Sequence, residues 1–284
     1  MSFQERYIEI TSVVQDDINK IKNSLTNDIF IQEPLKSKLF GILNAPSKHI
    51  RAAAAFLYLK AAGKQVDDKQ ILLQTAIELA HNASLIHDDV IDEGLLRRNK
   101  KTLNSEFENK LAVITGDYLL SAALKKICML NSFKLTEMFA QTLDNMCQGE
   151  ISQHFNRFKI PKLDEYIKKS QQKTASLFET AICGAVLLSG ADIDACEFAK
   201  NFGIAFQIRD DVINAKTTKS DIKDGVYTAP IIFSGDSSTP EKGIEKTVLL
   251  LNNYVNKAVK NLENLENNKY KQKLTELTEL LADG

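Results

Sequence analysis

The chain has 284 residues, of which 26% are charged and 44% hydrophobic, and its formal net charge is −1. These values are typical of a soluble globular protein, and the lack of a basic excess argues against a nucleic-acid or anionic-membrane partner. The N-terminus has no apolar segment typical of a signal peptide, and the most apolar run, 181–191, is too short to span a bilayer. The four cysteines form no CxxC pair, so we expect reduced thiols and a cytoplasmic protein.

Helices are predicted along the whole chain, because strand signals are almost absent and the five prolines separate segments with helical spacing of apolar residues. No Gly/Ser-rich or Pro-rich linker and no internal repeat interrupts these segments. The sequence therefore predicts a single all-α domain, a multi-helix bundle of residues 1–284. The expected helices are 3–24, 33–43, 48–63, 67–92, 105–129, 133–156, 163–189, 192–215, 240–263 and 267–282.

The segment 71–98 carries the strongest functional signal. Residues 71–86 contain one acid, Glu78, and no Lys or Arg, which predicts a helix that is buried on all sides. Asp88 and Asp92 follow one helical turn apart, so both carboxylates point the same way. Burying two like charges is costly, and a divalent cation removes that cost. Carboxylate oxygens suit Mg²⁺, which usually also binds substrate phosphates.

A second acidic pattern, DDVIN at 210–214, ends another strongly apolar helix. A single DDxxD motif is weak evidence, because most carboxylate runs on helices are solvated faces. Two copies, each at the end of an apolar helix, are much harder to explain as surface. If the two helices face each other, their acids form a cage that calls for metal ions bridging a bound anion.

The pairing of SLIHDDVID and a following RR with FQIRDDVIN resembles the trans-prenyl diphosphate synthases, the polyprenyl synthetase family. The resemblance extends from about Lys48 to the C-terminal helices. It implies the isoprenoid synthase fold, an all-helical bundle around a deep central cavity, usually as a homodimer. It also implies that about three Mg²⁺ ions help to condense isopentenyl diphosphate with an allylic diphosphate, in a 1′-4 trans reaction.

The resemblance assigns the acids to the metal site. Asp88 and Asp92 would bind the Mg²⁺ ions that hold the allylic diphosphate, and Asp89 would support them. Asp210 would bind the third Mg²⁺ ion from the opposite wall, with help from Asp211.

The basic residues are assigned to the two diphosphates. Guanidinium groups bind phosphates bidentately, so Arg97 would hold the allylic diphosphate and Arg98 the isopentenyl diphosphate. Lys48 and Arg51 resemble the family's GKxxRP element, and we expect them on one face at the start of a helix, where an anion is favoured. His81 corresponds to a family histidine that touches the same diphosphate.

Further residues are assigned to the leaving group and the reacting carbon. Lys173 and Thr174 match the family's KT pair, in which the lysine neutralises the departing diphosphate. The threonine and Gln207 would point oxygens at the developing carbocation. Lys216 would be a phosphate ligand. The family usually has Asp where this chain has Asn214, so that end of the metal site is expected to be weaker.

Small residues beneath the first acidic cluster predict a long product. Ser84 and Ala83 lie one turn below Asp88, and Ala80 lies two turns below. The first bulky side chain on this column is Ile77, eleven residues from the metals or roughly 16 Å along the helix, which leaves room for about three or four isoprene units. We therefore expect a product of C20 or longer.

Three other interpretations are weighed. A non-catalytic or partner-dependent subunit of a heteromeric synthase would lack the acids that this chain retains. A terpene cyclase would not need the paired arginines and the Lys48/Arg51 site for a second diphosphate. A di-iron four-helix bundle would need paired Glu-x-x-His motifs, and no pair of these is present.

Overall fold

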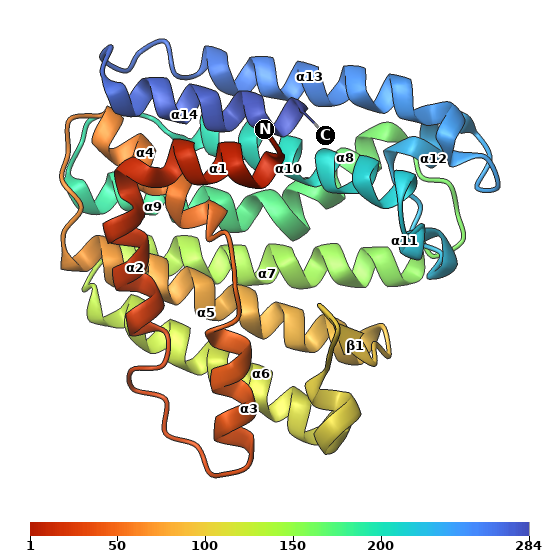
Figure 1. Cartoon of the computed structure of the whole chain (residues 1–284), viewed down its shortest axis with the longest axis horizontal. Coiled ribbons are helices and arrows are strands. Elements are labelled where there is room, and N and C mark those ends of the chain that lie inside the picture. Colours follow the sequence, from red (N-terminus) through yellow and green to blue (C-terminus); the bar gives the residue numbers. More distant parts are fainter. Residues whose placement is uncertain (284) are drawn as a thin grey trace.

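The computed structural model of the protein describes residues 1–283, and almost all of its regular structure is helical (Figure 1). The longer helices are α1 (Phe3–Thr11), α2 (Gln15–Ser24), α3 (Leu35–Leu43), α4 (Ile50–Ala61), α5 (Asp68–Ile91), α6 (Leu103–Met129), α7 (Phe133–Phe155), α8 (Leu163–Ser170), α9 (Ser176–Ser189), α10 (Cys196–Lys216), α13 (Ile244–Lys260) and α14 (Lys269–Glu279). The short elements are η1 (Ser12–Val14), η2 (Gln171–Ala175), α11 (Ser220–Lys223), α12 (Ala229–Ser234), η3 (Pro240–Gly243), η4 (Leu280–Ala282), β1 (Leu96–Arg97) and β2 (Lys100–Lys101). The predicted all-α fold is confirmed.

The helices stack in layers. In Figure 1, α13 and α14 form the outer layer, α4, α9 and α10 lie beneath them, and α7, α5 and α6 follow below. Helix α5 packs against α6 and α9, and α10 packs against α9, α13 and η2. Helices α2 and α3 run across this stack in the view shown. One cluster of buried apolar side chains extends from Tyr7 to Leu281, and an ion pair between Arg6 and Asp283 joins the two ends of the chain.

The helices were compared with the length and apolar character of a membrane-spanning segment. In the described part of the chain, every helix falls short of the combination of length and apolar character that crossing a bilayer requires.

Several predicted boundaries were wrong. The helix expected at 3–24 is divided by the 3₁₀ turn η1, and the helix expected at 163–189 is divided by the π-helical turn η2. The two-residue strands β1 and β2 form an antiparallel hairpin that strand propensity does not reveal, with Leu96 opposite Lys101. Helices α11 and α12 lie in the stretch 216–239, where no element was expected.

Helix α5 is anchored at its start and along one face. The Asp67 side chain accepts a hydrogen bond from the Gln70 backbone N–H at 3.0 Å and so caps the helix. The buried amides of Gln70 and Gln74 donate to the carbonyls of Ala185 and Ala181 on α9, at 3.1 and 2.8 Å. Because these bonds fix α5 on α9, its acidic C-terminal end is held in one position.

The π-helical turn η2 carries the predicted Lys173–Thr174 pair. Such turns insert an extra residue into a helix, and they occur frequently at functional sites. The turn packs against α10 at Gly203, where an added Cβ would lie 2.6 Å from Cα of Ala175. One turn further along α10, Gln207 meets Thr174. Gly203 therefore permits the close approach that brings these two side chains together.

We predict that Gly203→Ala lowers the free energy of unfolding by about 1–3 kcal/mol, because the new methyl group overpacks the contact with η2. In an open helix the same substitution normally stabilises. Gly41→Ala on α3 is the matched control, since its Cβ would meet nothing within 4 Å; it should raise stability by up to ~1 kcal/mol. Urea denaturation followed by circular dichroism measures both. Wild-type stability of the Gly203 variant would contradict the close contact.

Candidate active site

The acids at the end of α5 are each held by a different cation. Arg97 Nε lies 2.8 Å from Asp89 Oδ1, and Arg157 Nη2 lies 3.0 Å from Asp92 Oδ1. Lys173 on η2 lowers the pKa of Asp88 through its positive charge, and it forms an ion pair with Glu150 of α7. Three separate segments of the chain thus place a cation against this helix end.

Burial makes the ionised form of these acids costly. It raises the pKa of Asp88 to about 6, and neighbouring Glu150 and Asp92 add to the effect while Lys173 and Arg97 oppose it. Burial also raises the pKa of Asp92, where Lys173 again opposes the shift. The negative end of the α5 macrodipole disfavours carboxylates at this position as well. An added cation would therefore be strongly favoured here.

The acids at the end of α10 face two directions. Asp211 is buried and accepts hydrogen bonds from Tyr166 Oη at 2.5 Å and from Gln207 Nε2 at 2.8 Å. Gln207 Oε1 in turn accepts from Thr174 Oγ1 at 2.5 Å. Burial raises the pKa of Asp211 to about 7, with opposition from Tyr166. A chain of hydrogen bonds thus runs from η2 to the second acidic pattern.

Acids of both patterns line one small cavity of about 160 Å³, here called the acid cavity. Asp92 comes from α5 and Asp211 from α10, and Lys173, Thr174 and Gln207 also line the cavity. The predicted meeting of the two helix ends is therefore seen in this pair of acids. The expected pair, Asp88 and Asp210, does not line this cavity together.

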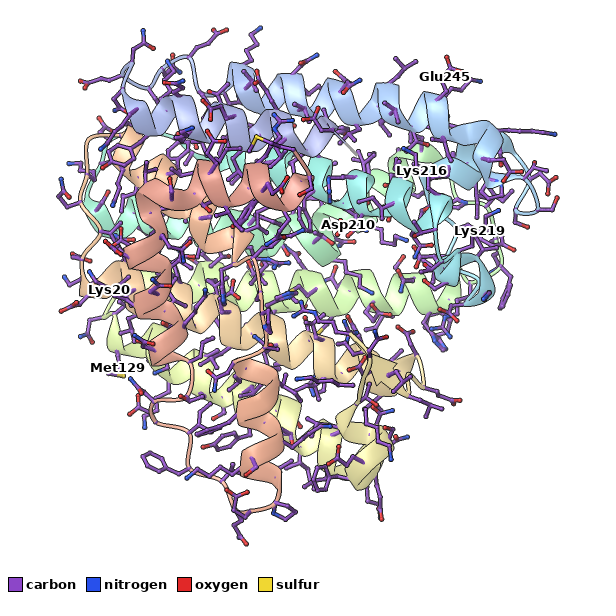
Figure 2. All side chains as sticks on the ribbon, in the orientation of Figure 1. Lys20, Met129, Asp210, Lys216, Lys219 and Glu245 are labelled. Carbon is purple, nitrogen blue, oxygen red and sulfur yellow. The ribbon has the colours of Figure 1, made fainter. Side chains whose placement is uncertain are left out.

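Asp210 instead borders a larger cavity of about 780 Å³, here called the cation cavity. Four of the residues predicted to bind isopentenyl diphosphate line it, namely Lys48, Arg51, His81 and Arg98. Burial raises the pKa of Asp210 to about 6, although Arg209, Lys48 and Arg51 oppose the shift. Figure 2 shows Asp210 near the middle of the molecule, with Lys216 closer to its edge.

One prediction about the cations was wrong. Lys48 does not lie on a helix, because α4 begins at Ile50 and His49 precedes it in the left-handed conformation, with φ 48°. The ammonium of Lys48 lies 4.3 Å from the centre of the Phe3 ring, and Tyr7 Oη donates to the Lys48 carbonyl at 2.5 Å. Lys48 is thus positioned by contacts with α1, while Arg51 stands in the first turn of α4.

A buried hydrogen-bonded pair, His49 and Glu78, lies behind these cations. His49 Nδ1 is 2.9 Å from Glu78 Oε2, and both side chains are 3% exposed. Burial lowers the pKa of His81 to about 3, with a further contribution from Arg51, so its imidazole is neutral and can still donate one hydrogen bond. The sequence analysis did not assign a role to Glu78, although a lone acid in an apolar helix was a usable signal.

Other contacts of the site were not predicted. Glu150 lies near the C-terminal end of α7 and Arg157 lies just beyond that end, and the sequence analysis predicted neither of their ion pairs. Asn214 Nδ2 donates to Asp221 Oδ1 at 3.0 Å and to Ser220 Oγ at 2.8 Å, so it ties α10 to α11. Lys216 is the exposed last residue of α10.

The predicted chain-length residues lie inside the bundle. Ala80, Ala83 and Ile77 are fully buried on α5, and Ser84 is half-buried. None of these four residues belongs to the lining of the acid cavity or the cation cavity. Their role in product length stays a prediction.

The residues present fit a divalent cation that shares its coordination with a ligand. Among residues 1–283 no three His, Cys, Asp or Glu side chains converge into a complete metal site. Mg²⁺ usually takes only one or two carboxylates and completes its shell with water and substrate phosphates. The carboxylates with raised pKa at the two helix ends are donors of this kind.

Comparison with known proteins identifies the family. Residues 32–267 match the model of the polyprenyl synthetase family, so the chain belongs to that family. It is 31% identical to a decaprenyl-diphosphate synthase of Dictyostelium discoideum, over 89% of this chain and 67% of that protein. It is 32% identical to the chloroplastic solanesyl-diphosphate synthase 2 of Oryza sativa subsp. japonica, over 79% of this chain and 60% of that protein.

The fold agrees with the same family. A crystal structure of a polyprenyl synthase from Caulobacter crescentus CB15, complexed with calcium and isoprenyl diphosphate, matches with a TM-score of 0.88. The two chains are 22% identical, and the match covers 100% of this chain and 98% of that one. The predicted isoprenoid synthase architecture is confirmed at the level of the fold.

We predict that Asp88→Asn stabilises the metal-free protein above roughly pH 7 and leaves its stability unchanged well below the ordinary carboxyl pKa of 3.8. The folded-state pKa of Asp88 is raised, so the native protein binds more protons than the unfolded chain between roughly pH 4 and 6. Its stability therefore falls as pH rises through that window, and the asparagine removes this loss.

Denaturation in EDTA across this pH range measures the effect. The exposed Asp192→Asn is the control and should follow the wild-type profile. An Asp88→Asn curve parallel to wild type would show that burial does not penalise this carboxylate.

Proposed function

We propose that this chain is a Mg²⁺-dependent trans-prenyl diphosphate synthase that condenses isopentenyl diphosphate with an allylic diphosphate. One observation carries the proposal: acids from both DDxx(D/N) patterns line the same cavity as Lys173, Thr174 and Gln207. The cation cavity, lined by Asp210 of the second pattern, offers a separate place for a second diphosphate. Membership of the polyprenyl synthetase family supports the same reaction class.

The acids are assigned to the metal. Asp88 and Asp92 on α5 and Asp210 on α10 would hold Mg²⁺ directly, with Asp89 and Asp211 in support. Mg²⁺ bound there would neutralise the diphosphate as it leaves. Because Arg157 holds Asp92 and Lys173 holds Glu150, these cations can keep the acids in place until a metal–diphosphate complex arrives.

The reacting groups are then bound by side chains. Arg97 and Lys173 bind the allylic diphosphate, and the C–O bond breaks with both electrons going to the diphosphate. Thr174 and Gln207 present oxygens to the allylic cation, and their mutual hydrogen bond fixes their direction. The double bond of isopentenyl diphosphate attacks this cation, and the released diphosphate takes the proton that is lost.

The second substrate is held on the opposite side. Lys48, Arg51 and Arg98 supply positive charge to its diphosphate, and the neutral His81 can donate a hydrogen bond. The buried Glu78 balances part of this charge while the cavity is empty, because it lies close to His49, Arg51 and His81. Lys216 at the end of α10 is assigned to the rim on the diphosphate side.

We assign a product of C20 or longer to the enzyme. The relatives named above make decaprenyl and solanesyl diphosphates, which are long. Ala80, Ala83 and Ser84 leave the column below Asp88 without a bulky side chain until Ile77. A partner-dependent subunit remains the alternative, and activity of the purified chain alone distinguishes the two.

Two further assignments belong to the same proposal. We assign residues 1–284 to one domain, supported by the continuous apolar cluster, and the active form to a homodimer. Large apolar side chains exposed on α6 and α7, such as Ile114 (61%) and Phe133 (85%), support such contacts between copies. The cytoplasm stays a prediction, and relatives in chloroplasts offer the plastid as the other compartment.

We predict that Asp88→Ala lowers turnover by about 10²-fold or more, because the metal–diphosphate complex loses a ligand. The assay incubates the purified protein with isopentenyl diphosphate, Mg²⁺ and each allylic primer, and measures the products by mass spectrometry. The exposed Asp192→Ala is the control and should keep full turnover. An active Asp88→Ala enzyme would remove this residue from the site.

We predict that Ala83→Phe shortens the product, because the phenyl ring would block the column below the metals. The ring also overpacks a buried position at a cost of about 1–3 kcal/mol, so thermal unfolding must first show a folded variant. The first condensation, measured with a short primer, should proceed at a rate close to wild type. A folded variant that makes products of wild-type length would show that the side chains below Asp88 do not set the product length.

A further inference from the structure

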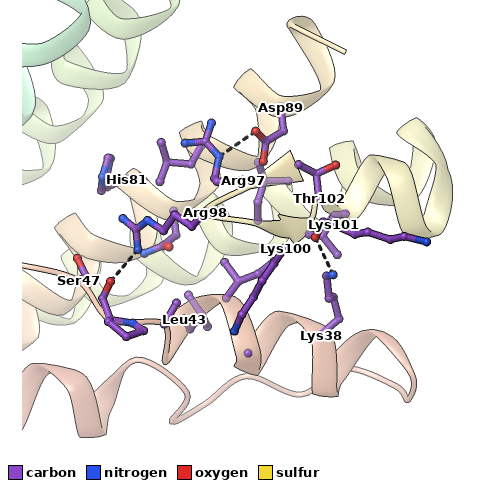
Figure 3. Close-up of a pocket in the computed structure, with 18 of the residues that line it drawn as sticks. Lys38, Leu43, Ser47, His81, Asp89, Arg97, Arg98, Lys100, Lys101 and Thr102 are labelled. Atoms are coloured by element: carbon purple, nitrogen blue, oxygen red, sulfur yellow. Dashed lines mark hydrogen bonds and ion pairs between the residues drawn. The ribbon is translucent and has the colours of Figure 1, made fainter. Parts of the chain in front are cut away.

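A third cavity, of about 510 Å³, lies between α3, the end of α5 and the β1–β2 hairpin (Figure 3). Its floor is apolar and comes from Ile42 and Leu43 on α3, Leu85 and Ile86 on α5, and Leu103. Its volume falls in the range of roughly 300–1,000 Å³ that is typical of small-molecule sites. We call it the hairpin cavity.

The rim of the hairpin cavity is basic. Five cationic side chains line it, namely Lys38, Arg97, Arg98, Lys100 and Lys101, against two carboxylates. Both carboxylates are already engaged, Glu78 by His49 and Asp89 by Arg97. The cavity therefore has an excess of positive charge that no acid within it balances.

Some of these cations already bind a carboxylate and others do not. Lys38 is bound to Glu106 and donates to the Lys101 carbonyl at 2.7 Å. The side chains of Lys100 and Lys101 contact no carboxylate within residues 1–283. Figure 3 shows Lys100 extending across the cavity toward α3. Figure 3 shows the Lys101 side chain extending away from the cavity, so an anion at the rim would meet Lys100 as the lysine that does not have to break an ion pair first.

The floor is open because α3 carries a glycine there. Gly41 lines the cavity, and a Cβ added to it would meet nothing within 4 Å. Glycine inside a helix costs about 1 kcal/mol relative to alanine, so α3 keeps this space at the expense of local stability. An apolar floor beneath a basic rim suits a ligand with a hydrocarbon chain and an anionic head.

The hairpin cavity adjoins the cation cavity. Ser47, His49, His81 and Arg98 line both, whereas Lys48, Arg51 and Asp210 line only the cation cavity. Arg98 Nη1 donates to the Pro46 carbonyl at 2.8 Å, so this guanidinium stands at the boundary between the two. A head group on the hairpin side would draw on the same Arg98 and His81 that are proposed to hold isopentenyl diphosphate.

We propose that the hairpin cavity binds prenyl phosphates or diphosphates by their head group and first isoprene units, and that its occupant inhibits the enzyme by competing for Arg98 and His81. The prenyl identity of the ligand and the inhibition rest on the function proposed above, whereas the binding of an anionic amphiphile rests on the lining of the cavity alone. The ligand class follows from the apolar floor, the basic rim and the amphiphilic substrates and products of a prenyl synthase.

Binding is tested by calorimetry on the metal-free protein, with EDTA present so that the acid cavity does not hold a phosphate through Mg²⁺. The probes are dodecyl phosphate, farnesyl phosphate and inorganic phosphate. Farnesyl phosphate should bind at least as tightly as dodecyl phosphate, and inorganic phosphate alone should not bind measurably. Binding of inorganic phosphate as tight as that of the amphiphiles would show that the floor contributes nothing.

Variants outside the substrate sites locate the binding. Gly41→Trp should fill the cavity and weaken binding of both amphiphiles by about tenfold or more, equivalent to roughly 1.4 kcal/mol. Gly41→Ala leaves most of the space open and should bind like wild type. Lys100→Glu reverses a charge on the exposed hairpin and should also weaken binding. This second variant tests the cavity independently if Gly41→Trp does not fold.

Kinetics then separates inhibition from binding. Dodecyl phosphate should raise the wild-type KM for isopentenyl diphosphate and leave that of Gly41→Trp unchanged, while turnover without amphiphile is the same in both. Amphiphile affinities unchanged in both Gly41→Trp and Lys100→Glu would overturn the proposal. If the wild-type chain shows no condensation activity but binds the amphiphiles, and the two variants lose that binding, the cavity is supported and only the proposed function is refuted.

Discussion

The burial of carboxylates toward the ends of two helices is the constraint on which the rest of this structure depends. Asp88 and Asp92 also stand at the negative end of the α5 macrodipole, which disfavours their charge, while Asp210 and Asp211 lie in the last part of α10. Burial raises the pKa of each acid, which measures how poorly the protein alone solvates their charge. Cations from the hairpin, from the turn after α7 and from η2 reduce this cost only in part.

The division into separate cavities follows from that constraint. Asp92 at the end of α5 and the buried Asp211 share the acid cavity with Lys173, while Asp210 lines the cation cavity with Lys48 and Arg51. Under the proposed function, one diphosphate would be bound through metal at the acid cavity and the other by cationic side chains at the cation cavity. Asn214 does not extend the acidic wall, because its amide is bonded to α11.

The buried Glu78 positions the segment that carries the cations of the cation cavity. Its hydrogen bond with His49 holds the left-handed residue that precedes α4, and both side chains are buried. A buried and satisfied polar contact of this kind can specify one arrangement of the groups around it. Here that arrangement is the turn that separates Lys48 from Arg51 and forms the wall between the cation cavity and the hairpin cavity.

The sequence by itself determined the helical fold and pointed to the acids and cations as site residues, because apolar periodicity and charge placement are local properties that a chain displays directly. The family resemblance added the prediction that Lys173 and Thr174 act with Gln207. Only the tertiary structure decided that η2 is a π-turn packed on Gly203, that Arg157 holds Asp92, and that Asp211 rather than Asp210 meets Asp92. These contacts join segments far apart in the chain, and their geometry depends on how helices rotate and pack, which no local pattern encodes.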